Sequence, residues 1–542
     1  MLSSNASHKD KFLAEAKAAR EERHWAATKT SSAVIIQSSV RGWLARITVR
    51  RRVLERFDQV FSPLEENQEA QPKPCVESYK AAKMFLYFVG RKDPGRLETL
   101  IRYIVASLAS ENPKISYVGV FLNKKYSVTW IEHIKQLCTE VLAALSDLSP
   151  EKPKFSKKSA VLVLALISFS STSTWSVLSA PSLAAVAPHM ANITKTVTGH
   201  LVQAGMMKTV NQLLLCGLAS PGSVTMSRAT LSAVVSLAGR PLLYTQYSQQ
   251  MVSLYILHVL SVPGIVQYSQ SLCGPTGMLG DPKECETLLL ETVKLLSQDQ
   301  QLRIHFNALE GSYALCLTAN LVQLVSRLKS LDGEPLVRLV TTLSQLLSAL
   351  GQYVTARQSP LSHWHPVLGW FSVSLDRHLQ ASLGLVRTQL ARLWSPECLV
   401  VITSHLHGLA ASLPPVSPPQ VVVNSPVESG KMFGVKMMRQ ALEKTKTTVA
   451  ATTSTMAAPV NRLGGPASTK VALVCALYQT ACQTLSQLRI DILNGLCYGD
   501  LLLKPLWIFL NSLGHNCGLK SFLELLSANK SGSAPEFQML IL

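Results

Sequence analysis

The chain has 542 residues, 47% of them hydrophobic and 16% charged, so it is long enough for several domains and too apolar to be mainly disordered. Its 52 Lys and Arg against 33 Asp and Glu give a net charge of +19, which favours an acidic partner: nucleic acid, an anionic membrane or an acidic protein. The first 60 residues contain 12 basic and 6 acidic side chains, and a second basic cluster lies between Lys431 and Lys470.

The eleven cysteines indicate a reducing compartment, because they are scattered through apolar runs and form no Cys-x-x-Cys pair. We expect buried free thiols and a cytoplasmic location. The start of the chain has neither a secretory pattern nor the acid-poor composition of a mitochondrial transit peptide. Ser159 to Thr194 lacks charged residues, but its continuous apolar stretch, Ala160–Ile167, is too short to cross a bilayer. We predict a buried core helix there and no transmembrane segment.

The first predicted element is one long helix from about Asp10 to Phe61. This stretch contains no proline and a single glycine, Gly42, and it is rich in Ala, Glu, Lys, Arg and Leu. Ser62-Pro63 ends the helix, and an acidic, Gln-rich stretch follows it. We therefore assign residues 1–61 to a long basic helix and residues 62–76 to a linker.

Residues 77–410 are predicted to form a helical domain. Leu-rich stretches alternate with short Pro/Gly/Ser breaks such as Ser220-Pro221-Gly222, and residues such as Leu339, Leu343 and Leu346 fall on one helical face. Sustained strand alternation with hairpin turns is missing, so the predicted fold class is all-α. No fixed period names a repeat family, and we expect an irregular, solenoid-like array of stacked helices.

Two further segments complete the predicted organisation. Residues 411–469 make a Pro/Thr-rich basic linker that ends near Gly464-Gly465-Pro466. Residues 470–542 resume helical periodicity and finish in apolar residues, which predicts a helix cut off partway.

The most informative motif lies in the middle of the first helix. Residues 36–46 read Ile-Gln-Ser-Ser-Val-Arg-Gly-Trp-Leu-Ala-Arg, and Val49 follows three residues later. They match the IQ pattern, Ile-Gln-x-x-x-Arg-Gly-x-x-x-Arg-x-x-hydrophobic, at every position. Residues 36, 40, 43 and 47 form an apolar stripe beside the stripe of 37, 41 and 45. Acidic calmodulin-like proteins grip such basic amphipathic helices with apolar grooves.

We therefore predict a site for calmodulin or a calmodulin-like protein, made of Ile36, Gln37, Val40, Arg41, Gly42, Arg46 and Val49. In proteins bearing this motif, Ile36 would enter the groove of the C-terminal lobe, Gln37 would bond to its backbone, and Arg41 would face acidic residues. Gly42 lacks a Cβ and would let the partner's backbone approach, and Arg46 would serve the second lobe. The calcium dependence stays open, although a complete motif usually permits binding without calcium. The alternative is a solvated helix face that matches by chance.

The remaining motifs are weaker. The arginines from Arg41 to Arg52 lack an aromatic stacking platform and acidic residues interleave on the helix, so we predict no nucleic-acid partner. His363-Trp364-His365-Pro366 cannot close a zinc site alone, and we expect a structural role at a helix boundary. No catalytic motif occurs, so we predict no catalytic residue, metal ligand or cofactor. The basic segment Lys431–Lys446 is expected to be a flexible linker; membrane-surface contact or a second calmodulin site are its alternatives.

Several short blocks point to a family. Ala19–Arg23 before the IQ motif, Ser171–Trp175, His363–Ser372 and Leu477–Thr480 resemble HECT-type ubiquitin-protein ligases of the IQ-motif subfamily, over essentially the whole chain. In that family an N-terminal IQ helix and a helical region precede a HECT domain, which accepts ubiquitin on a cysteine and passes it to a substrate lysine. The resemblance implies the calmodulin-binding, substrate-recruiting, non-catalytic part of such a ligase, and no cysteine here matches the family's catalytic one.

The apolar ending agrees with this resemblance. We expect the chain to be a fragment, a truncated gene model or a short isoform that has no ligase activity alone. The alternative function is a stand-alone helical adaptor or scaffold with a calmodulin-binding helix, and a third is membrane-surface attachment through Lys431–Lys446.

Overall fold

The structure is a computed structural model, and the part of the chain that it describes is helical apart from one hairpin. This confirms the predicted all-α class and the helical array. Lys431–Lys446, nearly all of the 411–469 linker and the apolar ending lie outside the described residues. The described residues are 3–61, 74–152, 154–218, 226–273, 279, 281–309, 311–356, 358–365, 370–375, 377–404, 406 and 466–512.

The chain divides into two compact units, residues 1–209 with 224–233, and residues 210–223 with 234–542. The division passes through α7 and α8, inside the stretch that the sequence predicted as one domain. The helices that lie wholly or partly in unit 1 are α1 (Ser3–Phe61), α2 (Cys75–Phe88), α3 (Pro94–Leu108), α4 (Ser127–Ser146), α5 (Phe155–Phe169), α6 (Ala187–Gln203), α7 (Met206–Leu218) and α8 (Arg228–Tyr244). Short 3₁₀ turns join them at Gly90–Lys92, Tyr117–Val120, Thr172–Thr174, Ser176–Ser179 and Pro181–Leu183.

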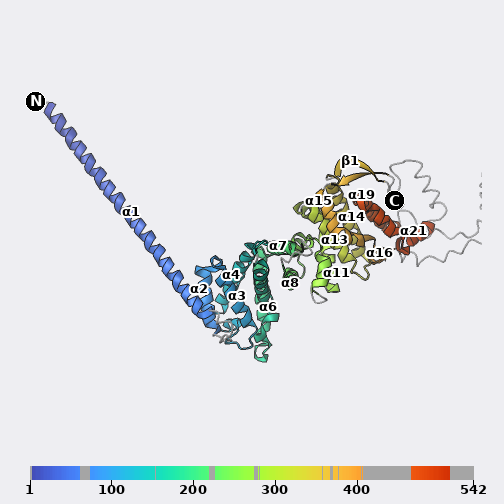
Figure 1. Cartoon of the computed structure of the whole chain (residues 1–542), viewed down its shortest axis with the longest axis horizontal. Coiled ribbons are helices and arrows are strands. Elements are labelled where there is room, and N and C mark those ends of the chain that lie inside the picture. The colour runs from blue at the N-terminus through green and yellow to red at the C-terminus, as the bar shows by residue number, and fades with distance from the viewer. Residues whose placement is uncertain are drawn as a thin grey trace, which may run out of the picture. The chain divides into compact units, whose positions relative to one another are not determined.

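Helix α1 is one uninterrupted element of 59 residues that packs against α2 and α3 only near its C-terminal end (Figure 1). Its length is about 88 Å at about 1.5 Å per residue. The anchor is an aromatic cluster in which the Phe57 ring lies 4.7 Å from Phe61 and 4.5 Å from Phe85. Arg96 of α3 adds a two-pronged ion pair to Asp58, with both contacts at 2.8 Å. The C-terminal end of α1 is therefore fixed to the body of unit 1.

The core of unit 1 is built from aromatic side chains of α2, α4 and the 3₁₀ turns. Trp130 is fully buried and meets Trp175 edge to face at 6.4 Å. The indole Nε1 of Trp175 donates to the Ser168 carbonyl at 2.7 Å. His133 is buried beside them, and its Nε2 lies 2.7 Å from the hydroxyl of Tyr117. The polar run that contains Trp175 thus closes the end of α5, the predicted buried core helix.

Unit 2 is organised around α13 (Gly311–Val325), an apolar helix that packs against α10, α14 and α15. Helix α14 also packs along α19, and the Thr484 hydroxyl at the end of α19 donates to the Leu347 carbonyl at 2.9 Å. The other helices of this unit are α9 (Gln249–Tyr255), a π-turn (Ile256–Leu260), α10 (Ile265–Cys273), α11 (Pro282–Leu296), α12 (Asp299–Ala308), α14 (Gly333–Ala356), α15 (Arg377–Leu390), α16 (Pro396–Ile402), α19 (Pro466–Thr484), α20 (Arg489–Cys497) and α21 (Asp500–Ser512), with 3₁₀ turns at Ala391–Trp394 and Ser486–Leu488.

A β-hairpin interrupts unit 2 where the sequence predicted a helix boundary. Strand β1 (Gln358–His365) pairs antiparallel with β2 (Trp370–Leu375), placing Trp364 opposite Phe371 and His365 opposite Trp370. The expected helix boundary was wrong, since His363, Trp364 and His365 belong to β1. Proline disfavours a helix at its own position and at the residue before it. Two prolines, Pro360 and Pro366, lie within one stretch of seven residues here, so a continuous helix is disfavoured. The aromatic and β-branched residues of β2 suit a strand.

Among the described residues, no single helix combines the length and the apolar character needed to span a membrane. One bent pair, Ser486–Cys497 with Asp500–Phe509, meets those criteria jointly, with an angle of 72° at the break. The predicted core helix is α5, where Val163, Leu166 and Phe169 are buried.

Candidate partner-binding site

The predicted IQ residues all lie on α1, upstream of its anchor. Ile36 is 63% exposed, Val40 is 47% exposed and Val49 is 36% exposed. Gln37, Arg41 and Arg46 are exposed as well, and Gly42 is intermediate. The helix therefore brings the seven residues onto one continuous, accessible segment; their role in binding stays a prediction.

Further apolar side chains stand in solvent on the same segment. Trp43 is 56% exposed, Ile47 is 45% exposed, and Trp25 upstream is 66% exposed with the Lys29 ammonium 5.3 Å from its ring centroid. Exposed large apolar side chains that gather on one element mark a surface for another molecule. Trp25 was not singled out in the sequence, where its flanks match no recognised pattern.

The charge of this segment is uniformly positive. Residues 23–54 contain seven Arg or Lys and no Asp or Glu, so the acidic residues of α1 lie outside it. Neither Arg41 nor Arg46 forms an ion pair with a carboxylate in the part of the chain that the structure describes. A basic helix with an exposed apolar stripe matches an acidic partner that has an apolar groove.

Gly42 is not needed by the fold of the chain itself. A Cβ added there would meet only the Arg46 guanidinium, at 3.5 Å, which is an ordinary contact. Glycine in the interior of a helix is unfavourable relative to alanine. Its presence in this open position agrees with the predicted close approach of a partner's backbone.

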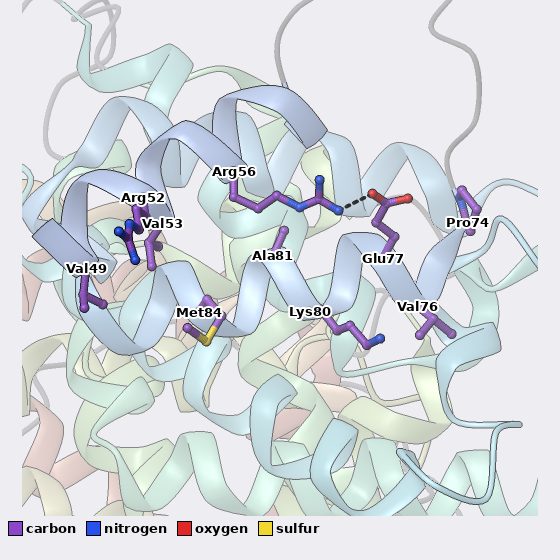
Figure 2. Close-up of a pocket in the computed structure, with 10 residues that line it drawn as sticks. All are labelled: Val49, Arg52, Val53, Arg56, Pro74, Val76, Glu77, Lys80, Ala81 and Met84. Carbon is purple, nitrogen blue, oxygen red and sulfur yellow. Dashed lines mark hydrogen bonds and ion pairs between the residues drawn. The ribbon is translucent and has the colours of Figure 1, made fainter.

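A groove opens between α1 and α2, directly after the IQ residues (Figure 2). It has a volume of about 740 Å³. Its wall combines apolar and basic side chains from both helices, and it is lined by Val49, Arg52, Val53, Arg56, Pro74, Val76, Glu77, Lys80, Ala81 and Met84. The guanidinium of Arg56 pairs with Glu77 at one end. Sequence reasoning missed this groove, because nothing local says that α2 folds back along α1.

The thiols that the structure describes are mostly shielded. All nine cysteines whose side chains it describes are free, and Cys497 alone among these nine is classed as exposed. Burial raises the pKa of Cys316, Cys398 and Cys475 to about 12, so these three stay protonated at neutral pH. The described residues contain no group of three or more His, Cys, Asp or Glu side chains placed to hold a metal ion.

Two of the blocks that carry the family resemblance contribute buried side chains, whereas Ala19–Arg23 lies exposed on α1. Trp175 belongs to the core of unit 1, as described above. The hydroxyl of Tyr478 donates to the Leu393 carbonyl at 3.0 Å inside unit 2. Residues 363–365 and 370–372 belong to the hairpin. The IQ segment of α1, in contrast to Trp175 and Tyr478, is accessible.

Comparison with known proteins agrees with the IQ motif and with the resemblance over the whole chain. Residues 30–50 match the family of the IQ calmodulin-binding motif. The mouse protein named ubiquitin-protein ligase E3B is 34% identical over 537 residues, 98% of this chain, and the human protein of that name is 32% identical over 541 residues. No solved structure matches. The chain spans about half of these relatives, 49% of each. Nearly the whole chain is therefore homologous to about half of the length of the proteins named ubiquitin-protein ligase E3B.

Proposed function

We propose that this chain is the non-catalytic N-terminal part of a HECT-type ubiquitin-protein ligase, which binds calmodulin through the IQ segment of α1 and recruits substrates for ubiquitination and ubiquitin-dependent catabolism. The observation that carries the proposal is the exposed, basic IQ segment fixed at one end to a helical body. The similarity to the mouse and human proteins supports the connection to ubiquitin transfer. The free cysteines suit the reducing cytoplasm, where we place the protein.

The first test is calorimetric titration of the purified whole chain with calmodulin, with and without calcium. Binding is expected in both conditions. The double variant Ile36→Glu, Arg41→Glu is expected to weaken it at least about a hundredfold, because it replaces an apolar contact residue by a charged one and reverses the charge of an arginine. Leu164→Glu is the matched control, because Leu164 is 48% exposed on α5 and lies outside the IQ segment. Absence of heat from the wild-type chain under both conditions would reject calmodulin as the partner.

The ligase part of the proposal has a separate test. An antibody against residues 1–60 is expected to detect an endogenous protein far larger than 59.1 kDa. A single band at the size of this chain would favour the stand-alone adaptor instead. Incubation of the purified chain with activating enzyme, conjugating enzyme and ubiquitin is expected to give no thiol-sensitive ubiquitin adduct, because the described thiols are mostly buried.

A further inference from the structure

The second half of the IQ motif and the groove share one face of α1. Gly42, Arg46, Val49 and Val53 follow the spacing i, i+4, i+7 and i+11, which is a single stripe on a helix. Val49 is the last residue of the motif and also lines the groove. Ile36, which begins the motif, lies on a different side of the helix. The surface of the second half of the motif is therefore continuous with the groove, and a partner bound to one also contacts the other.

Helix α2 supplies the opposite wall and runs back along α1 toward the motif. Its first turn pairs with α1 through Glu77 and Arg56, whereas Met84, two turns later, lies at the end of the groove where Val49 is found (Figure 2). Met84 is 46% exposed, and Tyr87, one turn further along α2, is 76% exposed. Met84 thus leaves a large apolar side chain in solvent at the end of the groove where Val49 is found.

The groove has the chemistry of the IQ segment itself. Arg52 and Lys80 add two positive charges at its edge, and no carboxylate among the described residues forms an ion pair with either. The Lys80 ammonium instead lies 5.8 Å from the centroid of the Tyr126 ring. An apolar floor with a positive edge fits an acidic surface that presents apolar side chains, and not a second strongly basic surface.

We propose that the α1–α2 groove is part of the docking site of the same calmodulin-like protein, so that one lobe grips the first half of the motif while the other lobe binds α1 and α2 together. This inference rests on the proposed function. It makes α2, which lies outside the motif, a determinant of affinity, and it ties the bound partner to the body of unit 1. Methionine suits such a contact, because its flexible, polarisable side chain adapts to a varied apolar surface.

The test is titration of the whole chain with calmodulin after substitutions in α2. Met84→Glu is expected to weaken binding about tenfold, and Lys80→Glu about three- to tenfold with a loss that shrinks in high salt. Leu164→Glu, on α5 in the same unit and at 48% about as exposed as Met84, is expected to bind within about twofold of wild type. All three substitutions fall on exposed side chains, and matching thermal unfolding curves confirm that the fold is kept.

The outcomes separate the two proposals. If Ile36→Glu abolishes binding while both α2 variants bind as wild type, the groove proposal is overturned and the calmodulin proposal stands. If the wild-type chain does not bind, the proposed function fails first. If Met84→Glu changes the oligomeric state of the chain and leaves calmodulin affinity unchanged, the groove is an interface between copies, which also overturns the inference.

Discussion

The IQ segment of α1 and helix α13 both carry large apolar side chains, in opposite surroundings. In α13, Leu315, Leu317 and Leu321 are at most 1% exposed, and the helix has no charged residue. In α1, Ile36 and Trp43 are 63% and 56% exposed on a helix whose other faces carry arginines. Charge on the remaining faces keeps α1 in water, so its apolar stripe stays available to a partner. Apolar content alone therefore does not separate core from interface.

The largest expected effect comes from cutting the anchor that joins α1 to the body of unit 1. Phe57→Ala removes a ring that is 2% exposed and lies against Phe61 and Phe85, and should cost unit 1 about 4 kcal/mol. Trp25→Ala on the same helix is the control, with an expected change within about 0.5 kcal/mol. Denaturant unfolding measures both, and equal losses would show that α1 is not held where the aromatic cluster suggests.

A polar core residue in unit 2 sharpens the contrast. Asn320 is fully buried, and its amide donates to the carbonyls of Leu260 at 2.8 Å and Val262 at 2.7 Å. Asn320→Leu removes the amide donor from both carbonyls, and the Val262 carbonyl keeps only a 3.4 Å bond from the Ile265 N–H, so the free energy of unfolding is expected to fall by about 2–4 kcal/mol, while the affinity for calmodulin is unchanged. Urea unfolding together with calorimetry checks this, and a variant as stable as wild type would contradict it.

A smaller effect follows from the buried histidine of unit 1. Burial lowers the pKa of His133 to about 3, with a lesser contribution from Lys83, so the folded state holds it neutral. The unfolded chain binds the proton below about pH 6.5, so stability is full above that pH and is lost as pH falls, by up to about 1.4 kcal/mol per pH unit. Unfolding at pH 7 and pH 5 measures the loss. His133→Gln should flatten this dependence, and an unchanged slope would assign it to other groups.

The smallest effect concerns the glycine in the exposed helix. Gly42→Ala places a methyl group in open space and should raise the stability of the helix by about 0.5–1 kcal/mol. The same change is expected to weaken calmodulin binding, because the partner's backbone then meets a Cβ. Circular dichroism follows the helix and calorimetry the affinity. Unchanged binding would mean that the partner keeps its distance from Gly42.

The sequence by itself determined the position of the IQ helix and the all-α class. Both rest on local properties, since the absence of proline together with apolar residues at helical spacing favours a helix. The shielding of most thiols was also predictable, because the cysteines lie within apolar runs.

Only the tertiary structure decided the hairpin, the division into two units and the groove beside Val49. The hairpin depends on the pairing of β1 with β2. That pairing is a contact between two strands, and the sequence of one strand alone does not specify it. The groove depends on where α2 returns after the linker, which places Met84 near Val49 across 35 positions of sequence. Such contacts arise from packing between elements, and periodicity within one element carries no information about which neighbour it will meet.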